Sequence, residues 1–291
     1  MSFTSLKEIT TKCNEEKKSF YEIVLELDSK QSNFTHEKEI KKMNSMWTAM
    51  KNAADSYDPK LFSSSKLTGG DGGKFEEYIK KNNSICGSFI GQVISCALQM
   101  AESNACMKRI VASPTAGSCG VLPAVLIPLY RNTIFSEEKI IEGLFVAAGI
   151  GQVIANRSSI SGAEGGCQAE IGAASSMAAG TLVYLHNGTP EQICAASGFA
   201  LQNLLGLVCD PVAGLVEIPC VKRNVIGAVN ACSCADMALA SITPKIPADE
   251  VIDAMKSVGN KIDSSLKETG RGGMASTPTA KNIYSKLSKI N

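Results

Sequence analysis

Three cysteines stand where glycine or proline interrupts a small-residue helical pattern: Cys167 in GAEGGCQAE, Cys209 in GLVCDPVAG and Cys220 in VEIPCVKRN. Such surroundings predict a bend at each cysteine rather than a packed helix face. Thiolates are the usual ligands of iron–sulfur clusters. Three of them would leave one iron of a four-iron cluster open, and metal-assisted reactions use an open position. The alternative for each cysteine is an inert buried thiol.

Spacing alone does not separate these interpretations, because the chain has no C-x-x-C pair. The neighbouring residues favour ligation. Two glycines before Cys167 let the backbone approach a bulky group, and Pro211 and Pro219 stiffen the segment between the other two thiols. Cys232 and Cys234 lie two residues apart on a predicted helix, where they would point in different directions, so we expect them in the core.

The loop SPTAGSCG, residues 113–120, offers a second set of groups. Ser113 and Thr115 carry hydroxyls, and the small residues Ala116 and Gly117 leave backbone N–H groups exposed. This composition predicts an anion cradle that would suit a substrate carboxylate. The alternative is an ordinary turn between two helices.

Polar residues directly after the third cysteine are further candidates. Lys222, Arg223 and Asn224 could begin a helix or orient a substrate, and Asn224 is predicted to be a substrate ligand. The two histidines, His36 and His186, lie in polar segments typical of the surface. A Ser-His-Asp triad or a histidine-rich zinc site therefore has little support, and the general base is not identified.

Helices must position these groups, since no alternating strand pattern recurs with hairpin turns. Residues 1–60 have apolar positions at helical spacing and predict an N-terminal arm of exposed amphipathic helices. Residues 61–291 are expected to form the main domain. Within it, the spacing predicts a helix over 84–107 with Ile85 on its apolar face, and Thr189-Pro190-Glu191-Gln192 predicts a capped helix start. The fold class is therefore mainly α, a single compact helical domain with an N-terminal helical arm.

Two further segments, one glycine-rich and one apolar, need interpretation. GGDGG, residues 69–73, lacks the spacing of a P-loop and predicts either a flexible linker or a loop that closes on a ligand. Residues 140–155 are the most apolar run, but Glu142 and Gln152 interrupt it, so no membrane span is expected.

Composition limits the function. The 291 residues include 29 basic and 28 acidic residues, for a net charge of +1, and this balance argues against nucleic-acid binding. The polar N-terminal sequence lacks a secretory signal, so we expect a cytoplasmic protein. In a reducing compartment, its eleven cysteines are expected to bind metal or be buried rather than form disulfides.

Long motifs in a fixed order carry a resemblance to a known family: GGDGGK, NACMKRIVASPTAGSCGVLPAVL, SISGAEGGCQAEIGAASSMAAG, NLLGLVCDPVAGLVEIPCVKRN and GGMASTPTAKN. From about Ser63 onwards the chain closely resembles the alpha subunit of iron–sulfur-dependent L-serine dehydratase. This resemblance implies a [4Fe–4S] cluster on Cys167, Cys209 and Cys220 with one open iron site, and no pyridoxal phosphate. It also implies that the 113–120 loop binds the substrate carboxylate.

The implied reaction converts L-serine to pyruvate and ammonia. The chain lacks the GPSSSHT-type segment of single-chain members, so a beta subunit is expected to complete the active site, including the base. The terminal sequence KLSKIN also lacks the cysteine that closes the open iron in some members. A higher oligomer is compatible with this arrangement. Two alternatives stay open: a related lyase that releases sulfide from L-cysteine, and a non-catalytic, cluster-bearing redox or iron sensor.

Overall fold

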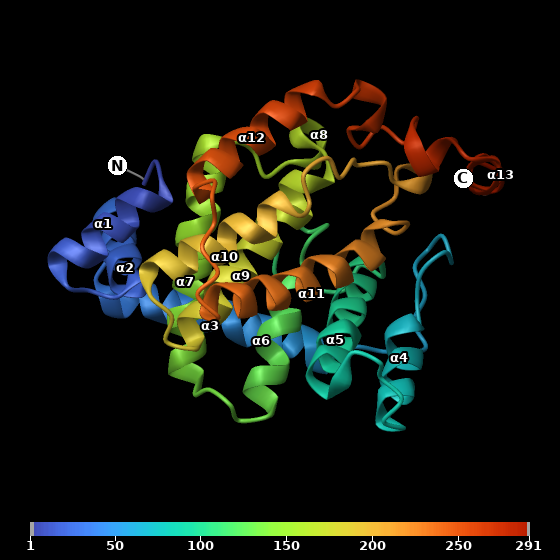
Figure 1. The fold of residues 1–291 in the computed structure, drawn as a ribbon. Helices are drawn as coiled ribbons and strands as arrows, with labels where there is room; N and C mark the ends of the chain where they lie inside the picture. Colours follow the sequence, from blue (N-terminus) through green and yellow to red (C-terminus); the bar gives the residue numbers. More distant parts are fainter. Residues whose placement is uncertain (1–2, 290–291) are drawn as a thin grey trace.

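The computed structural model describes residues 3–289, which form helices and loops without a β-strand. The predicted mainly α-helical fold is confirmed (Figure 1). The helices are α1 (Leu6–Glu16), α2 (Phe20–Ser32), α3 (His36–Asp55), α4 (Asp71–Lys80), α5 (Gly87–Ala105), α6 (Val121–Arg131), α7 (Glu137–Arg157), α8 (Gly162–Gly165), the π-helical turn η1 (Gln168–Gly172), α9 (Ala173–Leu185), α10 (Pro190–Gln202), α11 (Cys220–Leu239), α12 (Ala248–Lys261) and α13 (Pro278–Leu287). Short 3₁₀ segments cover Val212–Gly214, Ser264–Leu266 and Gly273–Ser276.

Helix α9 forms the centre of the fold, and every one of its residues is buried. It packs against α7, α10 and α11, which surround it in Figure 1. Its alanine, serine and glycine side chains let these helices approach closely. The Ser175 hydroxyl donates to the carbonyl oxygen of Gly227 on α11 at 2.7 Å, and the Ser176 hydroxyl donates to that of Ser197 on α10 at 3.0 Å. These bonds satisfy hydroxyls that would be costly to bury alone.

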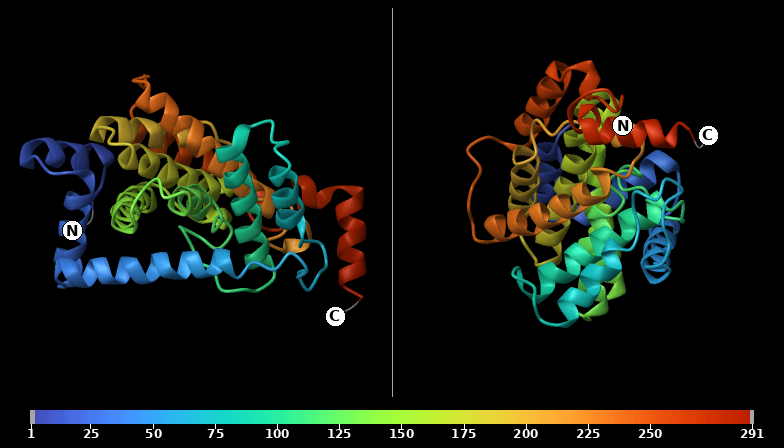
Figure 2. Two further views of the ribbon diagram at one scale, coloured as in Figure 1. Left: turned by 90° about the horizontal axis from the view of Figure 1, so that it is seen from below. Right: turned by 90° about the vertical axis from the view of Figure 1, so that its right-hand side faces the viewer.

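The first three helices enclose one side of this centre. In the left view of Figure 2, α3 runs along the bundle as one long helix. The apolar side chains of α1 to α3, among them Leu6, Phe20 and Trp47, join the same core cluster as the central helices. These helices are amphipathic as predicted, but their apolar faces are buried. The division at residue 60 stays a prediction.

Local signals located several helix ends correctly. Thr189 caps α10 in a capping box with Gln192, and Pro190 is the first helical residue. Helix α5 matches the predicted 84–107 helix, but Ile85 lies in the turn before it and is 97% exposed, so its predicted place on the apolar face was wrong. The expected glycine-rich loop is also shorter than predicted, because Asp71 already begins α4.

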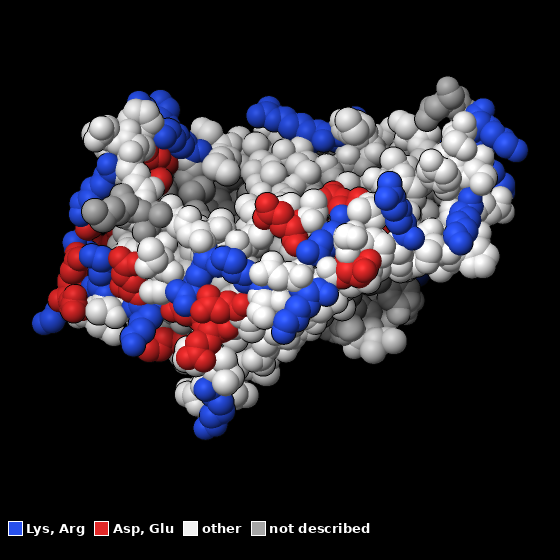
Figure 3. Space-filling view, turned by 90° about the horizontal axis from the view of Figure 1, so that it is seen from above, with Lys and Arg blue, Asp and Glu red and all other residues white. Residues whose placement is uncertain are grey.

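The distribution of charged side chains on the surface and the hydropathy of the helices agree with what the composition predicts. On the face shown in Figure 3, lysines and arginines are interspersed with aspartates and glutamates, without an extended basic surface. Among residues 3–289, no helix combines the length and the apolar character that a membrane span requires.

Candidate active site

The fold brings three cysteine-bearing segments together. Cys167 is the residue before the π-helical turn η1, and Cys220 is the first residue of α11. Cys209 lies in non-helical backbone that pairs with Lys267 in an isolated parallel bridge. All three side chains are buried. The expected bends hold for Cys167 and Cys209, whereas Cys220 begins a helix.

Electrostatics couple the three thiols. Both Cys167 and Cys209 are free thiols, and hydrogen bonding from Cys209 together with the charge of the Arg223 guanidinium lowers the pKa of Cys167 despite its burial. The same bond and burial raise the pKa of Cys209. Burial raises the pKa of Cys220 to about 12, and the charge of Cys167 adds to this shift. Cys232 and Cys234, which were predicted to lie in the core, are buried in α11, and this prediction is confirmed.

Arg223 ties the third thiol segment to the second. Its guanidinium donates to the carbonyl oxygen of Val208 at 2.6 Å and to the carboxylate of Asp210 at 2.8 Å. These two residues flank Cys209, while Arg223 lies one helical turn beyond Cys220. One side chain therefore fixes the residues on both sides of Cys209, one through its backbone and one through its side chain, relative to the start of α11. Its possible role in orienting substrate stays a prediction.

Gln168 ties the first thiol segment to the second in a similar way. Its backbone N–H donates to the carbonyl oxygen of Leu207 at 2.9 Å, and its side-chain oxygen accepts from the Gly206 N–H at 2.9 Å. The side-chain nitrogen donates to the carbonyl oxygen of Met255 on α12. The residue after Cys167 is thus bonded to the residues just before Cys209.

Asn224 connects the 113–120 loop to the third cysteine. Its side-chain nitrogen donates to the carbonyl oxygens of Gly117 at 2.8 Å and Cys220 at 3.0 Å. Its side-chain oxygen accepts from the Gly120 N–H at 2.8 Å. Both donors are used inside the chain, which indicates a positioning role. Its assignment as a substrate ligand stays a prediction.

The 113–120 loop presents unpaired donors. The Ser113 hydroxyl is buried and has no hydrogen-bond partner within residues 3–289. In the same part of the chain, the N–H groups of Ala116 and Gly117 find no acceptor. Thr115 instead donates to a carboxylate oxygen of Glu170 at 2.7 Å. Buried or clustered donors without partners are the expected features of a site that receives an anion.

Glu170 is the residue that sequence reasoning missed. It lies in η1, three residues after Cys167, and π-helical turns often occur at functional sites. Burial raises its pKa, and the bond from Thr115 partly opposes that shift. Its signal was visible in the motif GCQAEIGAASS, where it is the one acidic residue in a small, apolar segment. The contact with Thr115, 55 positions away, could not be inferred locally.

A strap formed by residues 63–74 lies beside the third cysteine. The hydroxyls of Ser63 and Ser65 donate to the buried carboxylate of Glu217, three residues before Cys220, at 2.7 and 2.8 Å. At the other end of the strap, Lys222 bonds to Asp71 at 2.6 Å. The strap is therefore bound to residues on both sides of Cys220, and its Asp71 end lies in the 69–73 segment predicted to be a linker or closing loop.

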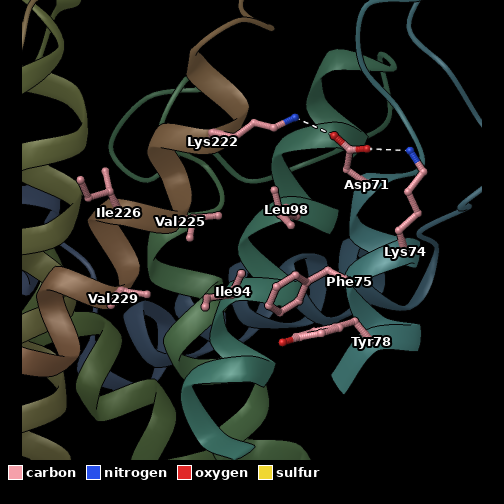
Figure 4. A pocket seen from close by; sticks show the side chains of 10 residues that line it. All are labelled: Asp71, Lys74, Phe75, Tyr78, Ile94, Leu98, Lys222, Val225, Ile226 and Val229. Carbon is pink, nitrogen blue, oxygen red and sulfur yellow. Dashed lines mark hydrogen bonds and ion pairs between the residues drawn. The ribbon is translucent and has the colours of Figure 1, made fainter. Parts of the chain in front are cut away.

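A groove of about 710 Å³ lies next to this ion pair, between α4, α5 and α11. Figure 4 shows Lys222 reaching from α11 to Asp71, which also bonds Lys74. Apolar side chains, including Phe75 and Ile226, line the rest of the groove. Its lining includes neither a thiol nor a histidine.

Comparison with known proteins identifies the family. Residues 15–275 match the model of the family described as serine dehydratase alpha chain. The chain belongs to the serine dehydratase alpha-chain family. The match begins before Ser63, so the family likeness includes most of the N-terminal helices as well.

Relatives of this family resemble the chain over nearly its whole length. A protein of Bacillus subtilis named probable L-serine dehydratase, alpha chain, is 44% identical over 98% of this chain and 95% of its own length. The L-serine dehydratase alpha chain of Peptoniphilus asaccharolyticus is 41% identical over 95% of each chain. An L-serine dehydratase of Helicobacter pylori is 38% identical over 94% of this chain, but over only 62% of its own length.

The three thiols that the fold brings together are the donor type that iron–sulfur clusters use. Within residues 3–289, no three His, Cys, Asp or Glu side chains are arranged to hold one metal ion. A cluster does not need such convergence, because each cysteine binds a different iron. Three buried thiols, brought together from three segments and close to a guanidinium, supply the appropriate donor chemistry.

Proposed function

We propose that this chain is the alpha subunit of a [4Fe–4S]-dependent L-serine dehydratase, which converts L-serine to pyruvate and ammonia. The observation that carries the proposal is the position of Asn224, which bonds both Cys220 and Gly117 and so joins the thiol site to the loop with unpaired donors. Family membership and the names of the relatives support the same reaction.

The reaction removes the α-proton and the β-hydroxyl of serine. The resulting aminoacrylate tautomerises to an imine, whose hydrolysis gives pyruvate and ammonia. When bound by Cys167, Cys209 and Cys220, the cluster would supply a Lewis-acidic iron that stabilises negative charge on the departing oxygen. The unpaired N–H groups of Ala116 and Gly117 and the Ser113 hydroxyl would bind the substrate carboxylate. Burial of the Ser113 hydroxyl limits competition from water at that donor.

A beta-chain partner is part of the proposal. The Helicobacter relative carries a further 38% of its length outside the region that this chain matches, so one polypeptide there holds more than the alpha region. We expect the base that removes the α-proton to come from the partner, since both histidines of this chain are exposed. Co-expression with a beta chain should therefore raise L-serine turnover strongly above that of the isolated chain. Full activity of the chain alone would contradict this expectation.

Ligand assignment can be tested by anaerobic iron and sulfide analysis. Cys167→Ser, Cys209→Ser and Cys220→Ser should each abolish cluster retention, whereas Cys232→Ser, a change in the same helix as Cys220, should leave it intact. Normal cluster content in any of the first three variants would refute the assignment. A colourless, iron-free wild-type preparation would refute the cluster itself.

Substrate choice needs a separate assay. Pyruvate formation from L-serine and L-cysteine, measured side by side with the cluster-loaded enzyme, separates a dehydratase from a sulfide-releasing lyase. A cluster-loaded enzyme with its partner that acts on neither amino acid would instead favour the sensor interpretation.

A further inference from the structure

Glu170 carries a carboxylate oxygen without a partner at the edge of the site. Oxygen Oε1 accepts the hydrogen bond from Thr115, whereas Oε2 accepts none within residues 3–289. The side chain is only partly buried, and Oε2 is not among the buried unpaired atoms. The free oxygen is therefore open to a ligand.

No cation of the described chain neutralises this carboxylate. Glu170 forms no ion pair within residues 3–289; burial raises its pKa, and the carboxylate of Glu268 raises it further. Arg223, the nearby guanidinium, is already bonded to Val208 and Asp210. A partly buried anion without a counter-charge is unfavourable unless a cation arrives with the ligand.

Two glycines place the carboxylate between the loop and the thiols. A Cβ added at Gly117 would lie 3.2 Å from Oε1, and one added at Gly162 would lie 2.7 Å from Oε2 and 3.2 Å from the Cys209 sulfur. The carboxylate thus packs directly on the backbone of the 113–120 loop and on the turn that also contacts Cys209. A ligand that spans the loop and the thiols must pass beside Glu170.

We infer that Glu170 binds the α-ammonium group of the amino-acid substrate. This role rests on the proposed function, in which the loop takes the carboxylate and the hydroxyl faces the thiol site. The third polar group of serine is a cation, and Glu170 is the anion left free between those two positions. Glu170 then selects amino acids over hydroxy acids of the same shape.

The inference predicts a loss that depends on the ammonium group. In the anaerobic, cluster-loaded complex with the beta chain, Glu170→Gln should raise KM for L-serine about 10- to 100-fold, the usual worth of a charged hydrogen bond, with a smaller effect on kcat. Inhibition by L-glycerate, which replaces the ammonium with a hydroxyl, should stay unchanged. Equal weakening of L-serine and L-glycerate, or a loss confined to kcat, would overturn the inference.

Binding without turnover provides an independent readout. L-Alanine and L-lactate differ only in the ammonium group, and neither has the hydroxyl that leaves. L-Alanine should raise the thermal midpoint of the wild-type complex more than L-lactate does, and Glu170→Gln should remove this difference. Glu164→Gln is the matched control, because Glu164 lies three residues before Cys167, is exposed and accepts a hydrogen bond from the Ser159 hydroxyl.

Controls separate this inference from the proposed function. If the loaded wild-type complex does not turn over L-serine, the proposed function fails. If it does, and Glu170→Gln keeps normal KM and normal iron, only the role of Glu170 fails. Should Glu170→Gln not fold, Glu170→Asp keeps the charge and should retain part of the preference for L-alanine over L-lactate; a complete loss of that preference in a folded, iron-loaded Glu170→Asp enzyme would count against the role.

Discussion

The carboxylate of Asp210 and the guanidinium of Arg223 form a buried ion pair, 2.8 Å apart, one residue away from Cys209. The same carboxylate accepts the N–H of Met274 at 2.7 Å, so Asp210 also holds the C-terminal GGMAS segment against the site. A pair at this depth organises the site, and removal of either partner leaves the other charge uncompensated.

Arg223→Met should therefore destabilise the chain strongly. Breaking a buried pair by removing one partner typically costs about 3–5 kcal/mol, and the backbone around Cys209 also loses its anchor. Urea unfolding and anaerobic iron analysis measure the two effects. The Arg157–Asp253 pair is the control, because it has similar hydrogen bonds but lies at the surface. Arg157→Met should cost no more than about 1 kcal/mol, and equal costs for the two variants would contradict this prediction.

Gly162→Ala should disturb Glu170 and Cys209 together. The added methyl would lie 2.7 Å from the Glu170 carboxylate, so the end of that flexible side chain must shift. We expect a higher KM for L-serine with only a small change in the free energy of unfolding. Gly172→Ala provides the control, since its new methyl would meet nothing closer than 3.6 Å. If Gly162→Ala behaves like Gly172→Ala, the carboxylate is not confined as described.

The double variant Ser63→Ala/Ser65→Ala should loosen the strap. It removes both hydroxyls that bond the buried Glu217 carboxylate, and an unsatisfied buried acceptor costs about 1–3 kcal/mol. Hydrogen–deuterium exchange of residues 63–70 should become faster. Ser64→Ala changes the exposed serine between them and should leave exchange unaltered. Identical exchange in the two variants would show that Glu217 does not hold the strap.

Asp71→Asn should produce a small, pH-dependent loss of stability. The bonds from Lys222 and Lys74 lower the pKa of Asp71 below its usual value of 3.8. Its stabilising contribution is therefore complete above pH 3.8 and disappears as the pH falls through the lower, folded-state pKa. Because the side chain is 36% exposed, the variant should lose at most about 1 kcal/mol at pH 7, and less in high salt. If the difference in unfolding free energy between wild type and variant instead increased towards acid pH, the prediction would be contradicted.

Local sequence signals predicted the framework of this fold well. The capping box at Thr189 and the buried pattern of α5 depend on residues within a few positions of one another, so they are readable from spacing. The failure at Ile85 has the same origin: a turn before α5 interrupts a spacing that looked continuous. The sequence thus predicted which segments are helical and where a strong cap begins a helix. It did not predict the exact first residue of a helix that lacks such a cap, as at α5.

The site was only partly accessible, because its contacts connect distant segments. Motif likeness selected the three cysteines and the 113–120 loop, but nothing near Glu170 in the chain announces Thr115. Arg223 and Asn224 were recognised as candidates from their position after Cys220, yet their partners, Asp210 and Gly117, are set by tertiary packing. Residues that position others are the hardest to infer, because they bond protein groups that are distant in the sequence.

Hydrogen bonds of the protein link the three thiol segments: Gln168 joins the first to the second, and Arg223 joins the second to the third. In a zinc finger the metal supplies such cross-links, and the polypeptide unfolds without it. If the proposed cluster binds here, it would add to links that the polypeptide already makes. Removal of iron should therefore cost this chain less of its fold than removal of zinc costs a zinc finger.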